Sequence, residues 1–221
     1  MKKVYVVLLC VLLMAGVSFA AEDINALTQR ARHGDAEAQY KLGLAYDNGD
    51  GVTQDYRQAF NWYSQAAKRG HPGAQNNLGI LYEYGRGVKQ DYKKAREWFL
   101  KAAGQYNGAA FGNLGYMYQR GEGVNVNYAK ALEYYRKGAE QNNSLSLNQM
   151  GYFYEYGMSV KADYNEAAKW YELAVREGND VSMCNLARLY EDGKGVNKDI
   201  NKAVDLYRQA AAKGSDTAKE A

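Results

Sequence analysis

The chain contains little cysteine, proline or histidine. Its 221 residues include two cysteines, one proline and two histidines. Cys10 lies in an apolar N-terminal run, so Cys184 stands alone in the rest of the chain and no disulfide can stabilise the fold. His33 and His71 have no acid or cysteine at the spacing of a metal-ligand set. We therefore expect a fold held by packing, without a metal or another cofactor.

The chain also lacks an excess of charge of one sign. It has 28 basic and 25 acidic residues, and 26 basic ones remain when Lys2 and Lys3 are set aside. Nucleic-acid binding needs a concentrated basic face, which so balanced a composition does not indicate. We expect no nucleic-acid partner and little attraction to an anionic membrane.

Long hydrophobic runs are absent after the first twenty residues. Val4 to Val17 is almost wholly apolar, follows two lysines and precedes Ser18-Phe19-Ala20, where small residues suit a signal peptidase. This pattern is typical of a secretory signal peptide, here residues 1–20, cut after Ala20. An uncleaved anchor is the alternative, but the run is short for a membrane span of about 20 residues. We expect a periplasmic or secreted protein with no stable membrane insertion after cleavage.

The remainder of the chain is a repeat with a period of 36 residues. A small residue recurs in five places, at Gly43, Gly79, Gly115, Gly151 and Ala187. Tyrosine keeps the same step, at Tyr46, Tyr82, Tyr118, Tyr154 and Tyr190. Matches at one fixed period through five units indicate a repeat protein. The units are 35–70, 71–106, 107–142, 143–178 and 179–214, between a lead-in, 21–34, and a tail, 215–221.

Each unit is predicted to form two helices. In the first unit, apolar residues follow helical spacing from Ala38 to Tyr46 and again from Tyr56 to Ala67. The glycines of Gly49-Asp50-Gly51 suit the turn between the helices, and aspartate stands where the N-cap of the second helix belongs. Its places in the units are Asp55, Asp91, Asp163 and Asp199. Residues 21–34 match the second half of a unit and are predicted to form an N-terminal capping helix, because a stacked array must close its open end.

One motif spans most of a unit. It reads A-x-x-x-L-G-x-x-Y-x-x-G-x-G-V-x-x-D-Y-x-x-A-x-x-W-Y-x-x-A-A from Ala38 to Ala67. This motif resembles the Sel-1-like repeat, a relative of the tetratricopeptide repeat, and the resemblance covers residues 35–214. It implies an all-α fold, a right-handed α-solenoid of five stacked 36-residue helix-turn-helix repeats that binds partners on its concave side. Members of the family are adaptors and scaffolds, and the exported bacterial ones are associated with envelope signalling or host contact.

Three residues depart from the motif at its glycine positions. Ser159 replaces the second loop glycine, and Tyr106 and Asn142 replace the glycine that ends a unit. These changes put the geometry of the local turns in question, and leave the fold unaffected.

The sequence contains no convincing active site. Ser-x-x-Lys and Lys-Thr-Gly, which a serine β-lactamase would use, are both absent. The Gly-x-Gly turns recur in four of the five units and lack the lysine and serine of a phosphate loop. His71-Pro72 indicates a turn followed by the first residue of a helix. We expect a protein that is not an enzyme, and a cell-wall or β-lactam hydrolase is the weakest alternative.

Tyrosines outside the motif suggest a binding surface. Outside the signal peptide, six tyrosines occupy no motif position. Five of these six fall in first helices, which the resemblance places on the concave side. Tyrosine offers a large contact area and a hydroxyl at little cost in rotamer entropy. The alternative is that these rings pack between adjacent units. We predict a partner-binding groove formed by Tyr40, Leu44, Asn76, Ile80, Tyr84, Tyr116, Arg120, Asn148, Tyr152, Tyr156 and Arg188.

The predicted function is that of an exported adaptor or scaffold. It would hold a partner protein or an extended peptide in this groove, without catalysis. A secreted factor that contacts host cells, as in virulence, is the second hypothesis. A polysaccharide ligand is also compatible with the aromatic faces, and the sequence does not separate it from a peptide.

Overall fold

The computed structural model describes residues 24–213. The predicted signal peptide at 1–20, residues 21–23, Gly214 and the tail at 215–221 lie outside the described residues. The described part contains eleven helices and no strand. The helices are α2 (Ile24–Arg32), α3 (Ala36–Asn48), α4 (Tyr56–Lys68), α5 (Pro72–Tyr84), α6 (Tyr92–Ala103), α7 (Gly108–Arg120), α8 (Tyr128–Glu140), α9 (Ser144–Tyr156), α10 (Tyr164–Arg176), α11 (Asp180–Asp192) and α12 (Ile200–Ala212).

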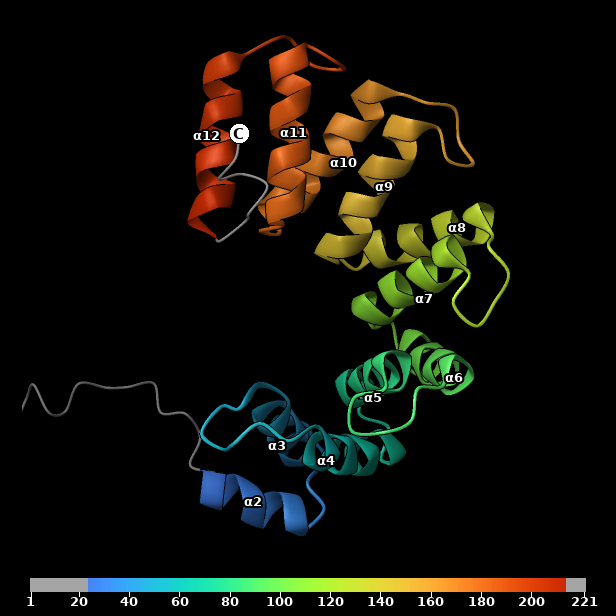
Figure 1. Ribbon diagram of the computed structural model, residues 1–221, viewed down its shortest axis with the longest axis vertical. Coiled ribbons are helices and arrows are strands. Elements are labelled where there is room, and N and C mark those ends of the chain that lie inside the picture. The colour runs from blue at the N-terminus through green and yellow to red at the C-terminus, as the bar shows by residue number, and fades with distance from the viewer. Residues whose placement is uncertain (1–23, 214–221) are drawn as a thin grey trace, which may run out of the picture.

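The helices form a stack of hairpins. Each unit supplies one pair of packed helices, namely α3 with α4, α5 with α6, α7 with α8, α9 with α10 and α11 with α12. The pairs follow one another along an arc from α2 to α12 (Figure 1). At the N-terminal end, α2 packs against α3 and buries Leu27 and Ala31. The predicted all-α solenoid of five helix-turn-helix repeats is therefore confirmed.

The stack curves toward its first helices. Successive first helices lie against each other, most extensively α7 with α9 and α3 with α5, whereas no two successive second helices pack as extensively as these pairs. In Figure 1, α5 and α7 lie on the inner side of the arc, and α6 and α8 lie outside them. The concave surface is accordingly built from first helices.

Caps set the ends of the helices. The carboxylate of Asp55 accepts hydrogen bonds from the backbone N–H groups of Arg57 and Gln58 at the start of α4. Asp91, Asp163 and Asp199 cap α6, α10 and α12 in the same way, which confirms the N-cap predictions. A glycine in the left-handed conformation ends every first helix, at Gly49, Gly85, Gly121, Gly157 and Gly193.

Three turns keep the glycine conformation without a glycine. Ser159, Tyr106 and Asn142 have φ angles of 58°, 60° and 53°. Gly195 and Gly178, at equivalent positions of unit five and the end of unit four, have φ angles of 68° and 79°. The departures from the motif therefore leave the turns intact and place side chains in a backbone region that L-residues disfavour.

Candidate partner-binding surface

Three tyrosines are well exposed on the concave surface. The exposed fraction is 57% for Tyr84 at the end of α5, 56% for Tyr156 at the end of α9 and 36% for Tyr152 one turn earlier. The rings of Tyr152 and Tyr156 lie with their centroids 4.5 Å apart. These three side chains present aromatic area and hydroxyl groups to solvent.

Arginines hold the neighbouring tyrosines in place. Nη1 of Arg120 donates a hydrogen bond of 2.7 Å to the hydroxyl of Tyr116, and the guanidinium lies 5.2 Å from the ring centroid. Nε of Arg120 lies 3.0 Å from Oε1 of Glu122. Arg86, which the sequence analysis did not single out, lies 5.3 Å from the ring centroid of Tyr84. Cation–π contacts of this kind orient the rings without covering both faces.

Three other predicted residues serve the packing between units. The ring of Tyr40 stacks on that of His71 with centroids 4.3 Å apart. It also lies over Gly73, where a Cβ would meet Cζ of Tyr40 at 2.9 Å. Leu44 and Ile80 are half-buried against core clusters that join their own unit to the next one. For these side chains the alternative of packing between units describes the structure.

The prediction that Asn76 and Asn148 line an open groove is wrong. Asn76 is 6% exposed and Asn148 is 8% exposed. Oδ1 of Asn76 accepts a hydrogen bond of 2.9 Å from Nδ2 of Asn113, one unit further on. Oδ1 of Asn148 accepts hydrogen bonds from Ser182 at 2.7 Å and Asn185 at 3.2 Å. Buried amides need such partners, so both asparagines tie neighbouring first helices together.

Tyrosine hydroxyls lie beneath the concave surface in four of the five units. Each hydroxyl comes from a second helix and donates to an acid or amide near the end of the first helix of its unit. The pairs are Tyr63 with Asp47 at 3.0 Å, Tyr135 with Gln119 at 2.6 Å, Tyr171 with Glu155 at 2.8 Å and Tyr207 with Glu191 at 3.4 Å. In unit four, Arg188 adds an ion pair to Glu155. Arg188 was predicted to line the open groove, but its guanidinium is partly engaged in this ion pair with Glu155.

Unit two lacks this hydroxyl. Phe99 stands at the position of the tyrosine, and Glu83, at the position of the acid, is only 4% exposed. Burial first and the carboxylate of Glu122 next raise the pKa of Glu83 to about 7, against the lowering effect of Arg120. This site was not among those predicted from the sequence. The sequence does contain a signal for it, because Phe99 stands at the repeat position of tyrosines whose hydroxyls pair with acids in other units.

The remaining candidates for chemistry have structural roles. Cys184 is buried in the core of unit five and forms no disulfide in the described part of the chain. His71 caps α5, with Nδ1 accepting from the N–H of Ala74 at 3.1 Å and Nε2 lying 3.0 Å from Glu37, as expected for a turn before Pro72. Residues 24–213 contain no group of three histidine, cysteine or acidic side chains that could hold a metal. Within the same residues, every helix is too short or too polar to cross a bilayer.

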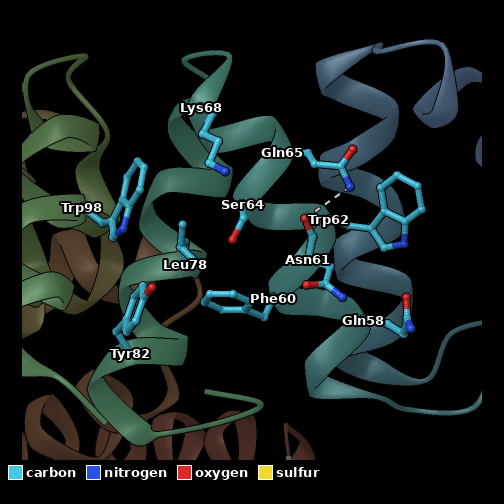
Figure 2. Close-up of a pocket in the computed structure, with 10 residues that line it drawn as sticks. All are labelled: Gln58, Phe60, Asn61, Trp62, Ser64, Gln65, Lys68, Leu78, Tyr82 and Trp98. Carbon is cyan, nitrogen blue, oxygen red and sulfur yellow. Dashed lines mark hydrogen bonds between the residues drawn. The ribbon is translucent and has the colours of Figure 1, made fainter. Parts of the chain in front are cut away.

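A second hollow lies on the outer side, along α4 and between it and α6. Its volume is about 550 Å³, and its lining combines aromatic rings with amides, a serine and a lysine (Figure 2). Phe60, Tyr82 and Trp98 pack on the core there, and the ammonium of Lys101 covers Trp98 at 3.9 Å from the ring centroid. Tyr82 and Trp98 stand at repeat positions whose counterparts Tyr118 and Tyr134 also pack on the core, whereas the counterpart of Phe60 in unit two is Arg96. Two of the three rings therefore serve the core of the repeat, and the hollow gives less reason than the concave surface to infer a ligand.

Comparison with known proteins identifies the repeat. The Sel1 repeat family model matches residues 36–71, 72–107, 113–143, 144–179 and 180–215. A search among functionally curated proteins finds no match.

Several solved structures resemble the chain over most of its length. A Sel1 repeat protein from Oxalobacter formigenes is 32% identical with a TM-score of 0.77, over 90% of this chain and 86% of that protein. The protective antigen c5321 of uropathogenic Escherichia coli, which has the SLR fold, is 40% identical with a TM-score of 0.73. The alignment covers 87% of this chain but only 41% of the antigen. The immunity protein PA5088 of Pseudomonas aeruginosa is 26% identical with a TM-score of 0.64, over 83% of this chain and 66% of that protein.

The five consecutive matches and these structures lead to one conclusion about the helix-hairpin array: the chain belongs to the Sel1 repeat family.

Proposed function

We propose that the protein is an exported, non-enzymatic adaptor that binds a segment of another protein on the concave surface of its helix stack. Sel1 repeat proteins are in general non-catalytic scaffolds and protein-interaction modules. The observation that carries the proposal is the exposure of Tyr84, Tyr152 and Tyr156 on first helices, outside the repeating core. Tyrosine is enriched at the energetic centres of protein interfaces.

The groove of the proposal is smaller than the sequence predicts. It keeps Tyr84, Tyr116, Arg120, Tyr152 and Tyr156, all of which are exposed or half-buried residues of first helices. Arg188 stays at its edge, with a side chain that is 35% exposed. A protein segment fits this surface better than a polysaccharide does, because the rings alternate with paired charges that discriminate between peptide side chains.

Affinity capture from the native envelope tests the proposal. We would compare the unmodified chain with the variant Tyr84→Ala/Tyr152→Ala/Tyr156→Ala and with a control, Leu100→Ala/Leu173→Ala, at exposed positions of second helices. Truncating hot-spot tyrosines typically costs about 2 kcal/mol or more each, so the tyrosine variant is expected to lose its partner. The control variant should retain it. Equal recovery by all three proteins would refute the groove.

The proposed export has its own test. Fractionation of cells followed by N-terminal sequencing should find the mature chain outside the cytoplasm and beginning at Ala21. A chain that stays in the cytoplasm with Met1 in place would contradict export while leaving the binding surface untouched.

Contact with host cells is a second candidate function. It is favoured by the 40% identity to a protein described as a protective antigen of uropathogenic Escherichia coli. Antibodies against the chain should then label intact bacteria or the culture medium. Recovery from the periplasm alone would exclude this role.

A further inference from the structure

Unit four shows how this fold satisfies a buried acid beneath its concave surface. Glu155 is 5% exposed. It accepts a hydrogen bond of 2.8 Å from the hydroxyl of Tyr171 on the second helix of its own unit. It also pairs with the guanidinium of Arg188, which comes from α11 in the next unit. A buried carboxylate is stable in the charged form when a cation and further donors surround it.

Unit two has the acid without either donor. Two repeat periods earlier in the chain, Glu83 takes the position of Glu155, Phe99 that of Tyr171 and Tyr116 that of Arg188. Glu83 is as deeply buried as its counterpart, at 4% exposed. Phe99 has no hydroxyl to donate, and Tyr116 supplies no cation at the position of Arg188; its hydroxyl accepts a hydrogen bond from Arg120.

A second acid lies beside Glu83. Glu122 lies beside it in the loop after α7, and it interacts unfavourably with an ionised Glu83. Glu122 pairs with Arg120, so the two acids share one cation and the group keeps one negative charge when both are ionised. Exposed Tyr84 stands next to this group at the end of α5 and provides an aromatic wall.

We propose that Glu83 and Glu122 bind a lysine or arginine side chain of the partner, so that a basic residue of the bound segment takes the place that Arg188 fills in unit four. This inference rests on the proposed function and specifies which partners the surface selects. The geometry of unit four shows that a guanidinium can reach this repeat position, and the charge of unit two complements it. A segment without a basic residue would leave Glu83 buried beside a second acid.

The same arrangement makes binding sensitive to pH. The charged groups beside Glu83 are Glu122 and Arg120, from α7 and its following loop, and Tyr84 lies next to Glu83 on α5. Burial and Glu122 favour the protonated form of Glu83, so a basic side chain must displace a proton to bind. Affinity is therefore expected to rise from pH 6 to pH 8.

Selection of peptides tests the inference without knowledge of the natural partner. The purified chain would be used to select from a random library of peptides twelve residues long, and binding of the selected peptides would be measured by fluorescence anisotropy. We expect lysine or arginine to be enriched at one fixed position of the selected peptides. Replacing that residue by glutamine, or using the protein variant Glu83→Gln, should each weaken binding about tenfold or more, because a hydrogen bond to a charged group is worth about 1.5–3 kcal/mol.

Two further variants make the result specific. Glu191→Gln removes the acid at the same repeat position of unit five and should leave binding unchanged. Tyr116→Arg reproduces the arrangement of Arg188 and Glu155 inside unit two, and it should abolish selection of basic peptides while keeping the helical circular dichroism spectrum. Peptides that bind equally well to the parent chain and to Glu83→Gln would overturn this inference and leave the groove standing. No peptide binding at all would overturn the inference and the proposed function together.

Discussion

The ring of Tyr135 on α8 lies directly against the backbone of Gly115 on α7. A Cβ added to Gly115 would lie 2.6 Å from both Cδ1 and Cε1 of that ring, and the ring is fully buried. The same contact joins Gly43 to Tyr63, Gly79 to Phe99 and Gly151 to Tyr171. The repeated glycine therefore exists because an aromatic ring of the second helix occupies the space of its side chain.

This contact predicts that Gly115→Ala destabilises the stack. The extra methyl group forces the buried ring of Tyr135 aside, which costs about 1–3 kcal/mol and outweighs the gain of helix propensity of about 1 kcal/mol. Ala187 stands at the same position in unit five, where the equivalent Tyr207 is only half-buried and its hydroxyl lies 3.4 Å from Glu191. Thermal unfolding should show a lower Tm for Gly115→Ala. A Tm above that of the parent chain would contradict the packing argument.

Restoring glycine at the strained turns is expected to stabilise the protein. A side chain in the left-handed region costs about 1–2 kcal/mol. Glycine removes this strain, but part of the gain is lost because glycine has a greater conformational entropy in the unfolded chain. Tyr106→Gly and Ser159→Gly should therefore each raise the free energy of unfolding by about 0.5–1 kcal/mol, measured by urea denaturation. Asn142→Gly should give less, since asparagine tolerates this conformation. An unchanged or lower midpoint for Tyr106→Gly would show that its exposed ring contributes more than the turn costs.

The pKa of Glu83 predicts a pH-dependent effect on stability. In the folded chain this pKa is raised from 4.5 to about 7, so the folded state holds a proton that the unfolded state releases above pH 4.5. The contribution of Glu83 to stability therefore falls as pH rises from about 4.5 to 7, and stays low above that. Glu83→Gln cannot ionise and should raise the Tm at pH 8, by about 2–4 °C for each kcal/mol recovered.

The same variant is expected to differ little from the parent chain at pH 4.5, where Glu83 is protonated in the folded state and about half protonated in the unfolded state. Glu191→Gln, at the exposed equivalent position, serves as the control and should show no such pH dependence. An equal Tm difference between Glu83→Gln and the parent at pH 4.5 and pH 8 would argue against a buried, protonated Glu83.

Asn148 should prove important for stability. Asn148→Ala leaves the hydroxyl of the buried Ser182 and the amide of Asn185 without their acceptor, which costs about 1–3 kcal/mol. Asn201→Ala, at an exposed helix position, provides the comparison and should change the free energy of unfolding by less than about 0.5 kcal/mol. Equal effects of the two substitutions in urea denaturation would mean that the hydrogen bonds between α9 and α11 contribute little.

The fold could be predicted from the sequence because the same sequence pattern repeats in five units. Helical spacing, the glycine turn and the N-cap aspartate agree within one unit, and the period of 36 residues fixes how units follow each other. The binding surface could be predicted only in part. Tyr84 and Tyr156 lie on the last turn of their helices and are exposed, whereas Tyr40 and Asn148 lie further inside, where the next unit covers them.

Burial by a neighbouring unit is the quantity that the repeat pattern does not reveal. It depends on how two helices of different units approach each other, and small residues such as Gly73 allow the ring of Tyr40 to come close. The unusual acid of unit two could have been found from the sequence, by comparing Phe99 with the tyrosines at its repeat position. Its pKa could not, because this depends on the distance to Glu122 in a loop of the next unit.

Site-specific photocrosslinking tests the central claim most directly. A photoreactive phenylalanine analogue would be placed, one position at a time, at Tyr84 and Tyr156 on the concave surface and at Leu100 and Leu173 on second helices, all exposed sites. Irradiation of cells should join the same partner to the chain from Tyr84 and Tyr156, and from neither leucine position. Crosslinks to a partner from Leu100 and Leu173 alone would place binding on the outer side and contradict the account.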